Sequence, residues 1–246
     1  AVAELAVPLP WQREVDWDGE RLVAREVKRL GALALVSRPT VAEPQERVSA
    51  LLALLRREGL ERLGWSPAAR QFAARVRFLQ AVFPEQEWPD CSTEGLLGSL
   101  ESWLSPHVAA VKGRTGLGRL DPLEPLQQRL SWQQRRQLEE LAPTHLEVPS
   151  GHRIPLDYEV AEPPVLAVKL QELFGLAETP RVAAGRVPVV LHLLSPARRP
   201  IQVTRDLGSF WHRTYPEVKK ELKGRYPKHP WPDDPWSAEP TRKIRR

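Results

Sequence analysis

Proline is the feature that most constrains how this 246-residue chain folds, because it occurs 25 times. Its ring removes a backbone hydrogen-bond donor and ends most helices and central strands. We therefore expect many short elements separated by turns rather than a few long helices. Apolar residues make up 41% of the chain and charged residues 27%, which is ordinary for a folded protein with a hydrophobic core.

The N-terminal part carries the pattern of a small antiparallel sheet. Two runs with alternating apolar residues flank Asp18-Gly19, a dipeptide that is typical of tight β-hairpin turns. We expect strands over residues 12–38, the third of them at 31–37. A sheet of this size is not stable alone in water, so we expect it to belong to a larger β-unit.

Helical periodicity replaces the alternating pattern after residue 40. Apolar residues three and four apart predict helices over residues 44–58, 66–83 and 92–104, which would form a small helical subdomain. The glycine-rich segment 112–120 follows. Its glycines do not have the spacing of a P-loop or of a dinucleotide-binding loop, so we interpret it as a linker.

A second mixed region begins at Ser131. Ser131 and Gln134 form a capping box, which predicts a helix that ends near residue 142. The later patterns predict a hairpin at 144–158, a strand and short helix at 164–176, a strongly buried strand at 186–195, a strand at 201–204, and two short helices that begin at Asp206 and Pro216. We expect the proline-rich end to lack regular structure.

Positive charge is concentrated at the C-terminal end of the chain. Residues 198–246 hold 13 Lys and Arg against 6 Asp and Glu, whereas the first 197 residues hold 23 against 25. Aromatic residues, Tyr215 among them, are interleaved with these cations. Cations neutralise phosphates and aromatic faces stack on unpaired bases, so this mixture favours single-stranded nucleic acid. The residues that we predict to bind it are Arg198, Arg199, Arg205, Trp211, Arg213, Lys219, Lys220, Lys223, Arg225, Tyr226, Lys228 and Trp231.

Two other interpretations stay open for this end of the chain. Phe210 and Trp211 would be core residues, and Lys219 and Lys223 merely solvated, if the segment binds no polyanion. Alternatively, the proline-rich end lies as an extended strap on another protein, which would make the chain an interaction module without nucleic-acid contact.

The sequence holds no pattern of a catalytic or metal site. His145, His152 and Asp157 are close in sequence, but their spacing is not one that metal sites use, and no HExxH or CxxC motif supports them. His192 lies in an apolar run, where we expect a core histidine. We therefore expect no catalytic residue, no metal and no cofactor in this chain.

Compartment and completeness can also be inferred. The single cysteine, Cys91, excludes an internal disulfide, and no apolar run approaches the ~18 residues of a membrane span, so we expect a cytoplasmic protein without membrane contact. The chain contains no Met, and we expect a fragment of a longer protein. Removal of an initiator Met is the alternative explanation.

Several long stretches resemble one bacterial family in order and spacing. They are LAPTHLEVPSG at 141–151, LDY at 156–158, LAVKLQELFGLAETPRVAAGRVPVVLHLLSPARRP at 166–200, QVTRDLGSFW at 202–211 and GRYPKHPWPDDP at 224–235. With RLGALALVSRP at 29–39, they resemble the C-terminal region of HrpB-type, DEAH-like ATP-dependent helicases.

The resemblance implies an α+β accessory region in three parts. Residues 1–40 would end an OB-like β-unit, residues 41–130 would form the helical subdomain and linker, and residues 131–246 would be the HrpB-type C-terminal domain. ATP and Mg would be bound by the N-terminal helicase motor of the same protein, because this chain has no GxGKT loop and no DEAH box. The implied partners are that motor and single-stranded RNA or DNA.

Overall fold

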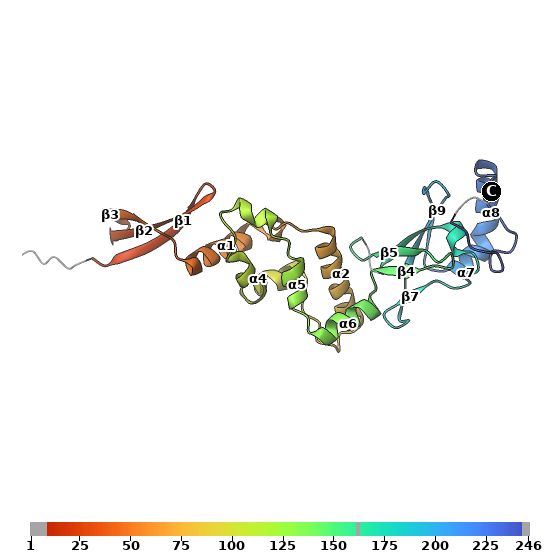
Figure 1. Cartoon of the computed structure of the whole chain (residues 1–246), viewed down its shortest axis with the longest axis horizontal. Helices are drawn as coiled ribbons and strands as arrows, with labels where there is room; N and C mark the ends of the chain where they lie inside the picture. Colours follow the sequence, from red (N-terminus) through yellow and green to blue (C-terminus); the bar gives the residue numbers. More distant parts are fainter. Residues whose placement is uncertain (1–8, 161–162, 243–246) are drawn as a thin grey trace, which may run out of the picture. The chain divides into compact units, whose positions relative to one another are not determined.

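The computed structural model describes residues 9–160 and 163–242, and these form an α+β fold as predicted (Figure 1). Residue contacts divide the chain into two compact units. The first comprises Ala1–Ala69 and Ser92–Arg129, and the second comprises Arg70–Cys91 and Leu130–Arg246. The division into three parts at residues 40 and 130 stays a prediction.

The first unit contains the predicted three-stranded antiparallel sheet. Strands β1 (Trp11–Asp18), β2 (Arg21–Leu30) and β3 (Leu33–Thr40) lie in the order β1-β2-β3. Gly19 in the β1–β2 turn has a φ of 57°, which glycine adopts without steric cost. The hairpin that Asp18-Gly19 predicts is therefore confirmed.

The helices of the first unit follow the predicted pattern with one exception. The predicted helices at 44–58 and 66–83 are confirmed, whereas the single helix predicted at 92–104 is wrong. It is two helices, interrupted at Ser99, whose hydroxyl donates to the carbonyl of Gly95 at 2.6 Å. Glycine and serine are weak helix formers, which favours a break at this point. The elements are α1 (Pro44–Glu58), η1 (Leu60–Arg62), α2 (Pro67–Val82, which continues into the second unit), α3 (Thr93–Gly98), α4 (Leu100–Val108), η2 (Thr115–Arg119) and α5 (Leu123–Gln128).

The glycine-rich segment at 112–120 is more than a linker, because it contacts the turn of the β1–β2 hairpin. The backbone N–H of Arg114 donates to the carbonyl of Glu20 at 3.3 Å, and that of Thr115 donates to the Glu20 carboxylate at 3.0 Å. Gly113 has a φ of 70°, and a Cβ at this position would lie 2.8 Å from the Glu20 carbonyl oxygen. The close approach therefore requires glycine.

The second unit is built on a five-stranded sheet in the order β10-β9-β6-β5-β4. Strands β6 and β9 are parallel, and the other neighbours are antiparallel. The hairpin predicted at 144–158, the strand and short helix predicted at 164–176 and the strand predicted at 201–204 are confirmed. The single strand predicted at 186–195 is instead two strands in different sheets. The strands are β4 (His145–Glu147), β5 (Arg153–Asp157), β6 (Val165–Lys169), β9 (Val190–Leu194) and β10 (Pro200–Thr204), with β7 (Arg181–Val182) and β8 (Val187–Pro188) in a separate pair.

One face of the five-stranded sheet forms the core of this unit. Successive side chains alternate between the faces of a strand, and the buried set on this face is Ile154, Leu156, Leu166, Val168, Leu191 and Leu193. On the opposite face Val165 and Val190 are buried, but Ala167 is exposed and its register partner His192 is half-buried. The prediction that His192 is a core residue is therefore wrong, because its strand presents it on the partly open face.

Helix α6 (Trp132–Leu141) begins at the predicted capping box. The Ser131 hydroxyl accepts from the backbone N–H of Gln134 at 3.2 Å, and the Gln134 side chain accepts from the Ser131 N–H at 2.9 Å. Arg75 of α2 is buried and donates to the carbonyls of Leu138 and Ala142. The Leu138 carbonyl also accepts from the Ala142 N–H at 3.0 Å, so Arg75 adds a second donor to it and a donor to the Ala142 carbonyl just beyond the end of α6.

The two helices predicted after residue 205 form one continuous helical segment. It comprises α7 (Leu207–Ser209), the π-helical turn η4 (Phe210–Thr214) and α8 (Tyr215–Arg225). Asp206 caps its start, as predicted, by accepting from the Ser209 N–H at 2.8 Å. Pro216 lies in the first turn of α8, where its missing N–H costs little.

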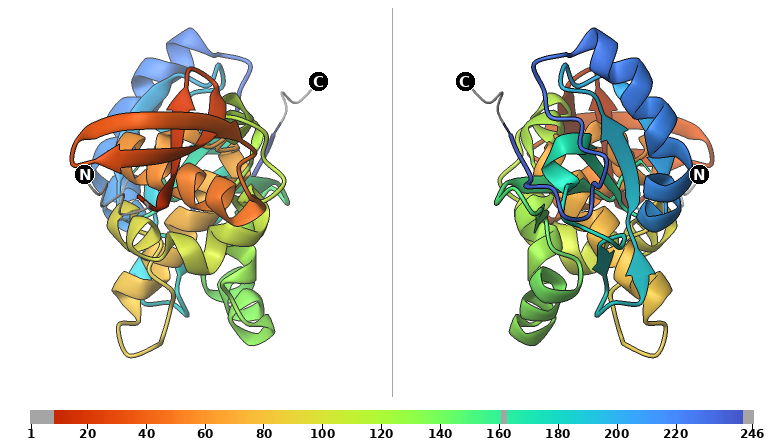
Figure 2. Two further views of the ribbon diagram at one scale, coloured as in Figure 1. Left: turned by 90° about the vertical axis from the view of Figure 1, so that its left-hand side faces the viewer. Right: turned by 90° about the vertical axis from the view of Figure 1, so that its right-hand side faces the viewer.

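The chain after α8 runs as an extended strap without regular elements in its described part, as predicted. It passes beside the short helix η3 (Leu170–Leu173), as the right-hand view of Figure 2 shows. The carbonyl of Pro235 accepts from Gly175 N–H at 2.9 Å, and Thr241 N–H donates to the Gln171 carbonyl at 3.0 Å. These two bonds fix the strap on the second unit.

Candidate nucleic-acid interface

A cluster of aromatic rings anchors the helical segment of residues 207–225. The rings of Trp211 and Tyr215 pack edge to face with centroids 5.3 Å apart, and both contact Phe174. Trp211 Nε1 donates to the Leu176 carbonyl at 2.8 Å, and the Tyr215 hydroxyl donates to the Pro232 carbonyl at 3.0 Å. The polar atoms of both rings are thus satisfied inside the protein, as burial requires.

This packing corrects two of the predicted stacking residues. Trp211 is only 2% exposed and Trp231 only 8%, and the indole N–H of Trp231 donates to the Tyr226 carbonyl at 2.9 Å. A ring that is enclosed on both faces cannot stack on a base. The interpretation that Phe210 and Trp211 are core residues is the one that agrees with the structure.

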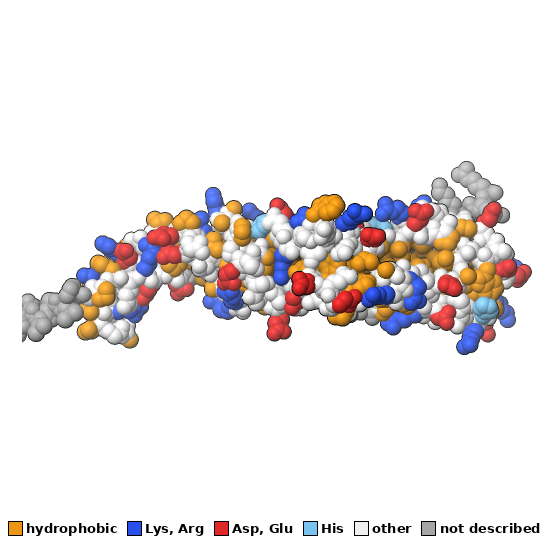
Figure 3. Space-filling model, turned by 90° about the horizontal axis from the view of Figure 1, so that it is seen from below, with side chains coloured by type: hydrophobic (Ala, Val, Ile, Leu, Met, Phe, Trp, Pro, Cys, Tyr) orange, Lys and Arg blue, Asp and Glu red, His pale blue; other side chains and the backbone are white. Residues whose placement is uncertain are grey.

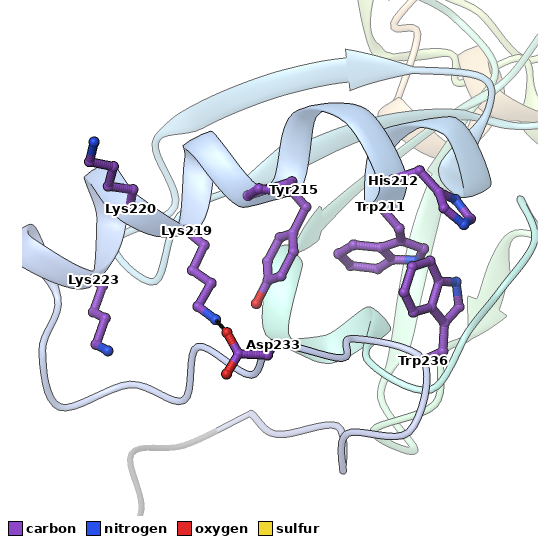
Figure 4. Close-up of a pocket in the computed structure, with 9 residues that line it drawn as sticks. Trp211, His212, Tyr215, Lys219, Lys220, Lys223, Asp233 and Trp236 are labelled. Atoms are coloured by element: carbon purple, nitrogen blue, oxygen red, sulfur yellow. Dashed lines mark hydrogen bonds and ion pairs between the residues drawn. The ribbon is translucent and has the colours of Figure 1, made fainter.

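A groove of about 500 Å³ lies between this helical segment and the strap, as Figure 4 shows. We refer to it as the lysine–tryptophan groove. It combines cationic and aromatic side chains with one carboxylate. Its lining residues are Trp211, His212, Tyr215, Pro216, Lys219, Lys220, Lys223, Asp233 and Trp236.

Two aromatic rings at one end of the groove belong to residues that we did not predict as binding residues from the sequence. The exposed His212 and the half-buried Trp236 lie with ring centroids 4.7 Å apart and planes at 51°. His212 Nδ1 lies 2.8 Å from the Gly208 carbonyl, and the Asp234 carboxylate accepts from the Trp236 N–H at 2.9 Å. The sequence offered one local indication of this arrangement, which is Asp234 two residues before Trp236. An aspartate side chain commonly accepts a hydrogen bond from the backbone N–H two residues further on and so forms a turn.

The three lysines of the groove point to two sides of α8. Lys219 and Lys223 are one helical turn apart and point to the same side, whereas Lys220 points away from them (Figure 4). Lys219 donates to the Asp233 carboxylate, and this hydrogen bond is the main reason why the pKa of Asp233 lies below its ordinary value. Lys219 is therefore neutralised in part, while Lys220 and Lys223 are exposed.

The remaining predicted residues do not join this groove. Arg198 lines a different pocket of the second unit, and the Arg199 N–H is bound by the Ser195 hydroxyl in the β9–β10 turn. On the face drawn in Figure 3, Lys and Arg side chains are interspersed with Asp and Glu side chains. The other residues, which are exposed or half-buried but do not line the groove, are Arg205, Arg213, Arg225, Tyr226 and Lys228.

Within the described ranges, no group of three or more His, Cys, Asp or Glu side chains is arranged to hold a metal ion. The ring of His145 lies 3.1 Å from the Thr144 hydroxyl, and that of His152 lies 2.8 Å from the Glu172 carboxylate. A search of the same residues finds no helix with the length and hydropathy of a membrane span.

The fold and the sequence together define the class of protein. A family model described as "ATP-dependent helicase C-terminal", HrpB_C, matches residues 103–235, so the chain belongs to the family of HrpB-type helicase C-terminal regions. The resemblance seen in the sequence is thereby confirmed.

Individual relatives agree with this assignment. The ATP-dependent RNA helicase HrpB of Escherichia coli (strain K12) is 43% identical over 235 residues, which cover 94% of this chain and 29% of that protein. A crystal structure of the E. coli DExH-box NTPase HrpB is similar with a TM-score of 0.81 and 42% identity over 96% of this chain and 30% of that one. A second, of the E. coli DEAH/RHA helicase HrpB, gives 0.70 and 39% identity over 94% and 30%. The chain thus spans about three-tenths of the length of these relatives.

Proposed function

We propose that this chain is an accessory region that docks on an ATP-dependent helicase motor of the same protein and contacts single-stranded nucleic acid through the lysine–tryptophan groove. In this proposal ATP and Mg belong to the motor, and the protein works in the cytoplasm. The observation that carries the proposal is an accessible ring pair in a groove that is lined by two lysines without ion pairs in the described part of the chain, Lys223 on one side of α8 and Lys220 on the other.

The groove offers the two kinds of contact that a single strand needs. The rings of His212 and Trp236 present aromatic surface at one end, where an unpaired base would stack. Lys220 and Lys223, unlike Lys219, form no salt bridge with any described residue, so their ammonium groups are available to phosphates. A duplex would not use the rings, because its bases are already stacked and paired.

The test is the anisotropy of fluorescently labelled single-stranded RNA, titrated with the chain at several salt concentrations and repeated with DNA. The logarithm of the association constant should fall with the logarithm of salt by about 0.7 per phosphate contact. The variant K220Q/K223Q should flatten this slope by about 1.4, because two contacts are lost. Trp236→Ala should weaken binding by roughly 1–3 kcal/mol, the free energy of one base–aromatic stack.

The matched control is Arg136→Gln, which removes an exposed cation of α6 outside the groove. It should leave the affinity and the salt slope close to those of the unaltered chain. Binding by K220Q/K223Q and Trp236→Ala that equals the unaltered chain contradicts the proposed contact. Such a result would leave the interpretation as a protein-interaction module.

Docking on the motor is supported by the exposed apolar side chains of the first sheet. Leu30 and Leu33 are each 63% exposed, and Leu35 and Val36 are 49% and 51% exposed. An apolar cluster of this kind marks a surface that another protein covers. In co-purification with the separately produced motor half, L33D/L35D should lose the motor and K220Q/K223Q should retain it. Equal recovery of both variants would contradict this role of the sheet.

A further inference from the structure

The second unit has another charged pocket, which the lysine–tryptophan groove does not include. It encloses about 420 Å³, within the range of ~300–1,000 Å³ that small-molecule sites occupy. We refer to it as the sheet-end pocket. Its polar lining residues are His152, Lys169, Glu172, Arg198 and Arg242, and its apolar ones are Ile154, Pro155, Ala167 and Leu194.

The pocket lies where the two parallel strands of the sheet end. Lys169 and Leu194 are the last residues of β6 and β9, and the register pairs them directly. The carboxyl ends of parallel strands are a common location of ligand sites, because loops diverge there and leave space. The adjoining sheet face is open, since Ala167 is exposed although it lies in a central strand.

The cations around the pocket have no partners among the described residues. Lys169 is half-buried and Arg198 and Arg242 are exposed, and no described carboxylate lies within salt-bridge distance of any of the three. With His152 neutral, the lining carries a net formal charge of +2. Unpaired positive charge on a concave surface attracts and concentrates anions.

The single carboxylate of the pocket is occupied by protein partners. Glu172 is 4% exposed and accepts from the Ser150 hydroxyl at 3.0 Å. Its Oε2 atom also lies 2.8 Å from Nδ1 of His152, which is the geometry of a hydrogen bond that fixes the imidazole ring. Nε2 of His152 therefore remains as the ring nitrogen for a ligand.

The turn that carries Arg198 is held in an unusual conformation. Arg198 has a φ of 61°, in the left-handed region that residues other than glycine rarely adopt. Its N–H donates to the Ser195 carbonyl at 2.8 Å, and the Ser195 N–H donates to the Arg199 carbonyl at 2.8 Å. These bonds fix the backbone from which the guanidinium of Arg198 extends to the pocket.

We propose that the sheet-end pocket binds a phosphate monoester, supplied by the terminal phosphate of a nucleic-acid strand or by a free nucleotide. A phosphate monoester carries nearly two negative charges on three terminal oxygens, which matches two guanidinium groups and one ammonium. A carboxylate or an internal phosphodiester carries one charge and would leave positive charge uncompensated. This proposal involves different residues from the lysine–tryptophan groove and does not depend on it.

Two pairs of probes test the proposal on the full chain. Calorimetry compares adenosine monophosphate with adenosine, and anisotropy compares a 5′-phosphorylated RNA decamer with its 5′-hydroxyl form. We expect at least one phosphorylated probe to bind about tenfold or more tightly than its partner, as charge-assisted contacts to phosphate imply. Preference only in the first pair identifies the free nucleotide as the source, and preference only in the second pair identifies the strand end.

Two variants assign the effect to this pocket. Lys169→Met keeps the length of the side chain, and Arg198→Asn removes the guanidinium with a residue that tolerates left-handed backbone. Each should reduce the phosphate preference by about tenfold, while R136Q and K220Q/K223Q should retain it. Circular dichroism checks that each variant is folded. If K169M does not fold, the phosphate preference of R198N alone decides the test. Equal binding within both pairs of probes, or a preference that survives in R198N, overturns the proposal.

Discussion

The two main sheets of this chain are stabilised in different ways, although both begin as short alternating strands. In β1–β3 only Ala24 and Val27 are buried, and every residue of β3 before Thr40 is exposed. Polar contacts hold that sheet to its unit, such as the Arg13–Glu46 ion pair and the bonds to Glu20. The three central strands of the five-stranded sheet, β5, β6 and β9, instead bury one face. The difference is that the first sheet leaves most of its apolar side chains exposed, whereas the second has a core of its own.

The largest expected effect is a difference in the free energy of unfolding between one substitution in each sheet. Leu166→Ala, at a side chain that is 0% exposed, should lower the free energy of unfolding by ~2–5 kcal/mol, because it leaves a cavity. Leu33→Ala, at 63% exposed, should change it by no more than ~0.5 kcal/mol. Urea denaturation followed by circular dichroism measures both. A similar loss for the two variants would show that β3 is covered in this chain.

A smaller effect is expected where the first sheet is attached. Gly113→Ala should cost about 1–3 kcal/mol, because the backbone is left-handed and the new Cβ would meet the Glu20 carbonyl. Gly59→Ala is the control, since Gly59 also has a positive φ, of 89°, but its Cβ would meet nothing within 4 Å. Hydrogen exchange should accelerate in β1 and β2 only for G113A. If the amides of β1 and β2 exchange equally slowly in both variants, the loss of stability in G113A comes from backbone strain alone and not from the contact with Glu20.

The smallest expected effect concerns an exposed polar contact of the second unit. The pKa of Asp233 lies below its ordinary value near 3.8, chiefly because Lys219 donates to the carboxylate. The ion pair is therefore complete above that value and is lost only as pH falls through the lowered pKa. Near neutral pH, Asp233→Asn should release Lys219 and steepen the salt slope of RNA binding by about 0.7. An unchanged slope would place Lys219 outside the strand's path.

Elements whose signals are local could be predicted from the sequence. The Asp18-Gly19 turn, the capping box at Ser131 and the helix start at Pro44 each depend on residues within one turn of chain, and all three agree with the structure. The break at Ser99 is also local, but the apolar residues on either side of it continue the helical period and conceal it.

Most of the candidate sites could not be predicted, because they depend on contacts between distant residues. Charge and aromatic content alone do not show that Trp211 faces Phe174, or that Asp233 neutralises Lys219. The ring pair of His212 and Trp236 forms only because the strap returns along the helical segment. The sheet-end pocket likewise joins residues from four separate stretches of the chain.

The π-helical turn η4 has a geometric consequence for everything that follows it. A wide turn of this kind accommodates one residue more than an α-helical turn, and each residue of an α-helix advances the direction of its side chain by about 100°. The wide turn therefore absorbs one residue without rotating α8 about its axis, and Leu222 of α8 stays in the interior. If all the residues of this segment were α-helical, α8 would be rotated by about 100°, so that Leu222 would leave the interior and the lysines would face another direction. Deleting one residue between Phe210 and Thr214 should thus convert the wide turn into an ordinary α-helical turn while α8 keeps its direction.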